Sequence, residues 1–207
     1  MDPTLQENAT KWLRRAERHH AENASHRDPY TAYFSYFIAL LIIAKDHDNN
    51  LRFKSESEEK MLRKVFKDFP ERILRAVGQP QLVSVTEELA NRLGNLHPGR
   101  DQSIIYIAPI NEANSSDDSR ATRIRKSRED AIADMRTLAE YWNHESTTID
   151  DRKISSCIFT FLWQVRNNLF HGQKGYGEKN RVVEDTKLLD RSCRLISAVV
   201  NEFIPSQ

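Results

Sequence analysis

The stretch "DPYTAYFSYFIALLIIAK", residues 28 to 45, decides the fold. An aspartate followed by a proline is a typical helix start, because the acid caps free N–H groups and proline fits the first helical position. The side chains that follow are apolar on more than one face of such a helix. A helix of this kind is stable only when other elements surround it, so we expect it at the centre of a bundle.

Apolar residues recur at helical spacing along most of the chain, and the alternation typical of strands is nearly absent. Asp2-Pro3 opens a first helix, Ser55 with Glu58 fits a capping box, and Pro70 predicts a break. Further helix ends are expected near Gly78, Gly94, Asn143 and Gly172. The sequence therefore predicts an all-α protein, a bundle of about seven helices.

Residues 95–119 interrupt this pattern. The segment "NLHPGRDQSIIYIAPINEANSSDDS" is turn-forming at both ends around one short β-like run, and we interpret it as an inserted loop or arm that is mobile or projects from the bundle. A length of 207 residues suits one domain. We expect N-terminal helices over 1–94, the arm over 95–119 and C-terminal helices over 120–207.

Composition describes a mixed surface, because a net charge of +1 accompanies 29% charged residues. This balance argues neither for nor against a nucleic-acid partner. Cys157 and Cys193 lie in apolar helical stretches and are interpreted as reduced core residues of an intracellular protein, with no zinc site. The most apolar run, Phe34 to Ala44, is shorter than the roughly 20 residues that span a bilayer, and no signal peptide opens the sequence. We expect a soluble, cytoplasmic protein without a membrane partner.

The stretch "FLWQVRNNLFHGQK", residues 161 to 174, places Arg166, Asn167 and His171 on an otherwise apolar helix. On an ideal helix, Arg166 and His171 are roughly 140° apart and about 7.5 Å along the axis, so they do not share a face. Two arrangements would bring them together. Either the helix end unwinds at Gly172, or a second copy of the chain contributes its own pair across a symmetric interface.

The run "RNNLFHG" resembles the HEPN domains, in which an arginine is followed directly by a polar residue and, after four residues, by a histidine near a helix end. The resemblance is specific over residues 154–203 and weaker over residues 30–45, and it does not explain the arm. It implies an all-α fold, commonly dimeric. Many members are metal-independent ribonucleases of toxin–antitoxin, abortive-infection or CRISPR-linked defence systems.

Carried over to this sequence, the resemblance implies that Arg166, Asn167 and His171 form a catalytic set at a dimer interface formed by the motif helix. RNA brings its own nucleophile, the 2′-hydroxyl, so a histidine that transfers the proton and a guanidinium that contacts the phosphate are sufficient. Asn167 would donate to a phosphate oxygen or fix the histidine tautomer. No metal and no other cofactor is expected, and the products would be a 2′,3′-cyclic phosphate and a 5′-hydroxyl.

Two other interpretations remain open. The chain could be a non-catalytic HEPN-like module that binds RNA, a nucleotide or a partner protein. It could also be a helical scaffold, in which Arg166 pairs with a buried carboxylate or interacts with the C-terminal helix dipole. We favour a ribonuclease that cuts single-stranded or loop RNA, acting as the toxin or effector of a prokaryotic defence or toxin–antitoxin system, with an antitoxin or defence protein as a possible partner.

Basic residues near the motif and at the end of the arm are candidate RNA contacts, although a solvated charged surface would have the same composition. The candidates are Lys174, Lys179 and Arg181 after the motif, and Arg123, Arg125 and Lys126 in "RATRIRKSRED".

Two further groups of residues are assigned structural roles. The histidines at 19, 20 and 26 and the run Asp46-His47-Asp48 lack a recognised ligand spacing, so we expect them in solvent rather than on a metal. The aromatic side chains between positions 30 and 37 are expected in the core, except that Tyr30 or Tyr36 could face a ligand instead.

Overall fold

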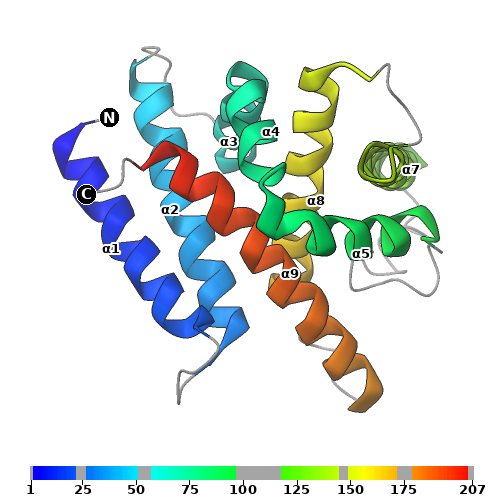
Figure 1. Ribbon diagram of the computed structural model, residues 1–207. Helices are drawn as coiled ribbons and strands as arrows, with labels where there is room; N and C mark the ends of the chain where they lie inside the picture. Colours follow the sequence, from blue (N-terminus) through cyan, green and yellow to red (C-terminus); the bar gives the residue numbers. More distant parts are fainter. Residues whose placement is uncertain are drawn as a thin grey trace.

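The computed structural model describes residues 2–21, 27–50, 57–96, 118–144, 149–171 and 179–204. Within these ranges, the side chains of residues 50, 118–121, 123–125, 170–171 and 179–185 lie outside the description. The described part of the chain contains 8 α-helices and no strand, which confirms the all-α prediction. In order, they are α1 (Pro3–His20), α2 (Pro29–Asn50), α3 (Glu58–Asp68), α4 (Pro70–Val77), the 3-10 helix η1 (Pro80–Leu82), α5 (Val83–Gly94), α7 (Asp118–Trp142), α8 (Asp151–His171) and α9 (Lys179–Phe203) (Figure 1).

Helix α2 occupies the centre that its sequence predicts. It packs against α1, α3 and α9, and α9 crosses it on the face shown in Figure 1. Its buried side chains include Tyr33, Tyr36, Phe37 and Leu40. Of the two residues named as exceptions, Tyr36 is only 2% exposed and Tyr30 is partly buried, whereas Phe34 is 41% exposed. The difference arises because α1 and α9 enclose the face of α2 that carries Tyr36.

Several helix boundaries follow local signals. The Asp2 side chain accepts hydrogen bonds from the backbone N–H groups of Thr4 and Leu5, as expected of an N-cap. Helix α3 begins at Glu58 with Ser57 as its N-cap, and Ser55 of the predicted capping box lies outside the described residues. Most of the predicted arm over residues 95–119 lies outside the described residues, which resume at Asp118 as the start of α7.

The break between α3 and α4 has a specific partner in α8. Pro70 has no N–H group, so the carbonyl of Phe66 loses the donor that a continuing helix would supply. The buried hydroxyl of Ser155 donates to this carbonyl at 2.6 Å. The side chain of Arg63, in the middle of α3, also lies over the Phe159 ring of α8 at 4.7 Å. Both contacts fix α3 to the helix that carries the motif.

Helix α7 forms a second set of contacts with α8. Asp134 of α7 accepts from the Thr160 hydroxyl at 2.9 Å and pairs with Lys153 at 2.5 Å. Cys157 lies beside this group, and burial, followed by the charge of Asp134, raises the pKa of its thiol to about 12. Burial also raises the pKa of Cys193, so both thiols are protonated core side chains at neutral pH, as predicted.

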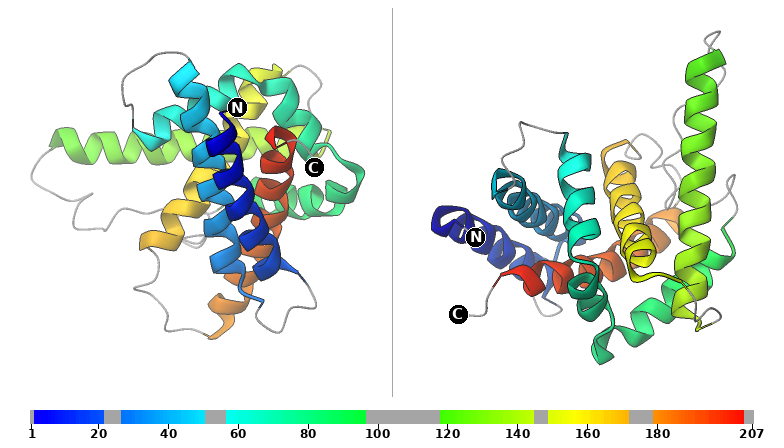
Figure 2. Two further views of the ribbon diagram at one scale, coloured as in Figure 1. Left: turned by 90° about the vertical axis from the view of Figure 1, so that its left-hand side faces the viewer. Right: turned by 90° about the horizontal axis from the view of Figure 1, so that it is seen from above.

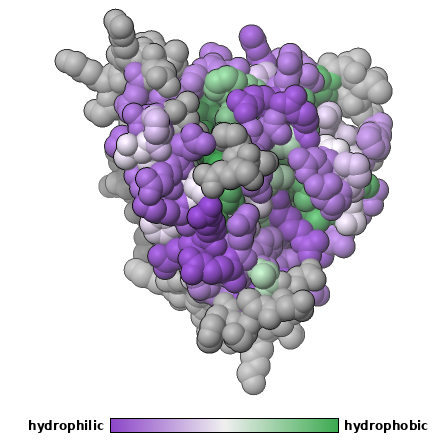
Figure 3. All heavy atoms as spheres, turned by 60° about the vertical axis from the view of Figure 1, so that its left-hand side comes forward, coloured by the Kyte–Doolittle hydropathy of each residue, from purple (hydrophilic) through white to green (hydrophobic). Residues whose placement is uncertain are grey.

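The surface in Figure 3 is mostly hydrophilic, with hydrophobic side chains in narrow strips between polar ones. Among the described residues, no helix has the length and apolar character needed to cross a membrane.

The Ser155 contact predicts a measurable loss of stability. Ser155→Ala leaves the Phe66 carbonyl buried without its donor, which costs about 1–3 kcal/mol. Ser156→Ala, at the adjacent and only partly buried position, is the matched control and should cost about 0.5 kcal/mol or less. Urea unfolding measures both values, and equal losses in the two variants would show that the hydroxyl of Ser155 has no special role.

Candidate functional site

The motif lies in the last turns of α8, which ends at His171, the residue before Gly172. Because the helix continues as far as His171, the five-residue offset between Arg166 and His171 persists along the backbone. The side chain of His171 lies outside the described residues, whereas those of Arg166 and Asn167 are described and partly buried.

The guanidinium of Arg166 lies against aromatic rings and polar partners. Its central carbon is 5.0 Å from the centroid of the Trp163 ring and 5.9 Å from that of Phe37. One terminal nitrogen donates to the side-chain oxygen of Asn167 at 3.1 Å, and the other lies 3.3 Å from a carboxylate oxygen of Glu58. Cation–π contacts of this kind orient a guanidinium without neutralising it. The side chain keeps 24% of its surface exposed, so a ligand in solvent can reach it.

A second arginine continues this arrangement along the same side of α8. Phe159 stacks with Trp163 at a centroid distance of 5.9 Å, and Arg63 lies over Phe159. We call the five side chains of Arg63, Phe159, Trp163, Arg166 and Phe37 the arginine–aromatic row. Their packing holds the two guanidinium groups in fixed positions at the edge of the core.

Each arginine of the row is paired with a carboxylate from the first turn of α3. Glu58 pairs with Arg166, and Glu59 pairs with Arg63 at 2.9 Å. The Glu58 side chain is 54% exposed. Ion pairs with so much solvent contact contribute about 0–1 kcal/mol, so another anion can displace Glu58 at little cost. The prediction that Arg166 pairs with a buried carboxylate in a scaffold does not describe this contact.

This arrangement can bind an anion with a defined orientation. A guanidinium presents its N–H groups in a planar fork that matches two oxygens of a phosphate or a carboxylate. The side-chain amide of Asn167 supplies further donors beside it. Trp163 is partly buried and adds an aromatic surface that touches the same guanidinium.

The predicted RNA contacts are mostly outside the described residues. Lys174 lies outside the described residues. The side chains of four further candidates also lie outside them, namely Lys179, Arg181, Arg123 and Arg125. Lys126 is exposed in the first half of α7. One end of α7 extends beyond the rest of the bundle (Figure 2). The described polar contacts of α7 with α8 join Asp134 to Lys153 and Thr160, nearer the start of α8 than the motif. Lys126 is therefore not among the described neighbours of Arg166.

The run Asp46-His47-Asp48 is more buried than its sequence suggests. Asp46 is 8% exposed and accepts from the backbone N–H of Asp2 at 2.8 Å, and Asp48 is 4% exposed and pairs with Lys64 at 3.1 Å. The expectation of solvent exposure is wrong for both, because α1 and α3 cover the end of α2. Across the part of the chain that is described, no three His, Cys, Asp or Glu side chains are grouped as metal ligands.

Sequence reasoning missed the residues that surround Arg166. Trp163 precedes Arg166 by three positions, which places the two on one helix face, so its contact was open to prediction. Glu58, Arg63 and Phe37 come from other helices, and no local pattern connects them with the motif.

Comparison of the chain with models of protein families, with curated proteins and with solved structures finds no match. The resemblance to HEPN domains therefore depends on the motif residues and their setting in α8.

Proposed function

We propose that the protein is a metal-independent, HEPN-type endoribonuclease that cuts single-stranded or loop RNA. The observation that supports this most is the guanidinium of Arg166, which is oriented by Trp163 and Phe37 yet remains reachable from solvent. It lies beside Asn167 on a helix whose last residue is His171. A fixed cation, an amide donor and a histidine are the groups that cleavage by a 2′-hydroxyl requires.

In the proposed reaction, Arg166 and Asn167 bind the scissile phosphate. His171 takes the proton of the 2′-hydroxyl as its oxygen forms a bond to phosphorus. The bond from phosphorus to the 5′-oxygen breaks, and a protonated histidine donates a proton to that oxygen. The products are a 2′,3′-cyclic phosphate and a 5′-hydroxyl, and the guanidinium stabilises the charge that builds on the phosphate oxygens.

A homodimer is part of the proposal because of the offset between Arg166 and His171. The two residues lie on different sides of α8, and α8 stays helical up to His171. A second copy of the motif helix across a two-fold axis would place one chain's histidine near the other chain's arginine, and would supply both an acid and a base. An RNA-cutting toxin or effector of a defence system would then be kept in check by a partner protein in the cytoplasm.

The alternative is a HEPN-like module that binds RNA or a partner without cutting it. The ion pair between Glu58 and Arg166 is compatible with both proposals, because an RNA phosphate would replace Glu58 in either case. The two proposals share the anion-binding role of Arg166 and differ in whether His171 transfers a proton.

The first test is RNA cleavage by the purified protein in EDTA. Cleavage should proceed, and His171→Ala should reduce it at least about 100-fold while RNA binding largely remains, because proton transfer is lost. Arg166→Lys should be nearly as damaging as Arg166→Ala, because lysine keeps the charge but lacks the fork. His144→Ala, at an exposed histidine after α7, is the control and should cleave normally. Cleavage that survives His171→Ala, or that needs magnesium, would refute the assignment.

The second test concerns Glu58. In a His171→Ala background, Glu58→Gln should tighten RNA binding about three- to fivefold, the equivalent of one exposed ion pair. Glu59→Gln makes the same change of charge one residue away, where the partner is Arg63, and should have a smaller effect. Fluorescence anisotropy with labelled RNA measures both. Identical gains in the two variants would mean that only the overall charge matters.

The third test is the oligomeric state. Sedimentation velocity at micromolar concentration should show a dimer with and without RNA, since the proposed site needs two copies of α8. A monomer under all of these conditions would contradict the shared site.

A further inference from the structure

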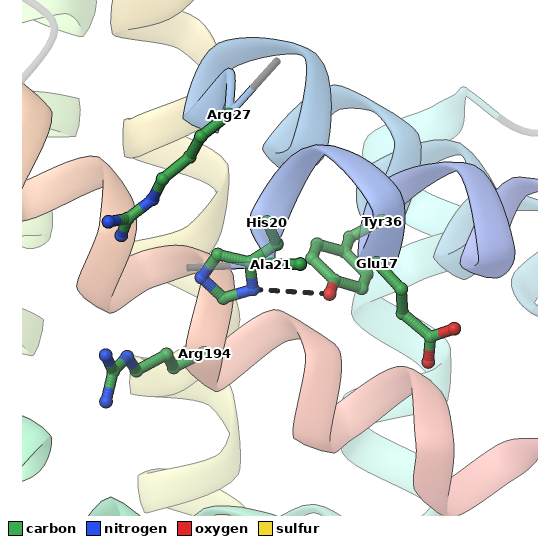
Figure 4. A pocket seen from close by; sticks show the side chains of 6 residues that line it. All are labelled: Glu17, His20, Ala21, Arg27, Tyr36 and Arg194. Carbon is green, nitrogen blue, oxygen red and sulfur yellow. Dashed lines mark hydrogen bonds between the residues drawn. The ribbon is translucent and has the colours of Figure 1, made fainter. Parts of the chain in front are cut away.

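A separate pocket lies where the C-terminal end of α1 meets the start of α2 and the middle of α9. Its volume is about 300 Å³, and it is lined by Glu17, His20, Ala21, Arg27, Tyr36 and Arg194 (Figure 4). Tyr36 lines this pocket, whereas the next residue, Phe37, contacts Arg166. The pocket and the arginine–aromatic row therefore lie on different faces of α2.

The charged groups of the pocket are distributed unevenly. The guanidinium groups of Arg27 and Arg194 flank the His20 ring at one edge of the pocket (Figure 4). The Glu17 carboxylate points away from both of them. Asp190 is the acid that all three basic groups share. It pairs with Arg27, and its oxygens lie 3.5 Å from Nε2 of His20 and 3.7 Å from Nε of Arg194. Two guanidinium groups thus face two carboxylates in this region, those of Asp190 and Glu17, but only Asp190 lies against the arginines, because the Glu17 carboxylate points away from them.

His20 is neutral in this setting for a physical reason. Burial is the largest influence and lowers its pKa, Asp190 opposes the shift, and Arg194 and Arg27 add to it. Its Nδ1 lies 3.3 Å from the hydroxyl of Tyr36. An imidazole in this position can gain a proton when a second anion enters, because that anion offsets the two guanidinium charges.

We propose that this pocket binds the phosphate monoester group of a small molecule. Two planar forks, one from the segment before α2 and one from α9, can contact more than one edge of a tetrahedral phosphate. Asp190 is the internal counter-ion that holds the two arginines in place. The site takes no part in RNA cleavage, so it does not depend on the function proposed for Arg166.

Isothermal titration calorimetry of the full chain tests this proposal, with inorganic phosphate, adenosine 5′-monophosphate and phosphate-free adenosine as probes. Both phosphate compounds should bind and adenosine should not. Equal affinities would identify free phosphate as the ligand, and an affinity at least about tenfold higher for the nucleotide would identify a nucleoside monophosphate. An absence of heat for both phosphate probes up to about 10 mM would overturn the proposal, because two guanidinium contacts should give tighter binding than that.

Substitutions on α9 locate the binding. Arg194→Gln should weaken phosphate binding about tenfold or more. Arg191→Gln is the matched control, because Arg191 lies one turn earlier on α9 and pairs with Glu88 of α5 outside the pocket. The phosphate affinity of this variant should stay within about twofold of the wild type.

Arg194→Lys provides a second variant if Arg194→Gln fails to fold, as judged by circular dichroism. It keeps the charge and should still bind several times more weakly, because it lacks the fork. Equal losses in the Arg191 and Arg194 variants would place the binding elsewhere and refute the pocket.

Discussion

The enclosure of α2 is the constraint on which the rest of the structure depends. Its apolar side chains point in several directions, so α1, α3 and α9 must all pack around it. Two buried tyrosines on this helix also need polar partners, because a hydroxyl without one is costly in a core. Tyr33 donates to the carbonyl of Leu162 at 2.7 Å, shortly before the motif, and Tyr36 reaches His20. One central helix thus positions both the end of α8 and the pocket beside α1.

The setting of Arg166 reconciles burial with charge. A guanidinium over Trp163 and Phe37 loses part of its hydration but gains attraction from the two rings, so it stays charged and ordered. Glu58 adds an ion pair from a different helix, at a position where solvent weakens it. The result is a cation whose direction is set by the core and whose anionic partner can be exchanged. The proposed binding and catalysis would both benefit from this combination, because neither requires the arginine to reorganise.

Local sequence signals located the helices well and the contacts between them poorly. Asp2 as a cap, Pro29 as a first helical residue and the end of α8 before Gly172 each depend on neighbours in the chain. The contact of Glu58 with Arg166 joins residues from α3 and α8, and no periodic pattern encodes it. The same reason explains why Phe34 rather than Tyr36 is exposed, since both are compatible with an apolar helix and only the packing of α1 and α9 distinguishes them.

The bond from Ser155 to the Phe66 carbonyl has an evolutionary consequence. The hydroxyl at position 155 replaces the N–H that Pro70 lacks, and another residue at position 70 would return an N–H to the carbonyl once the helix continued through Phe69. The two positions are therefore epistatic: a substitution at one changes which residues are acceptable at the other. Sequences that diverge from this one should lose the proline at position 70 and the hydroxyl at position 155 together. Covariation between these positions of α4 and α8 would then reflect the one backbone N–H that proline lacks.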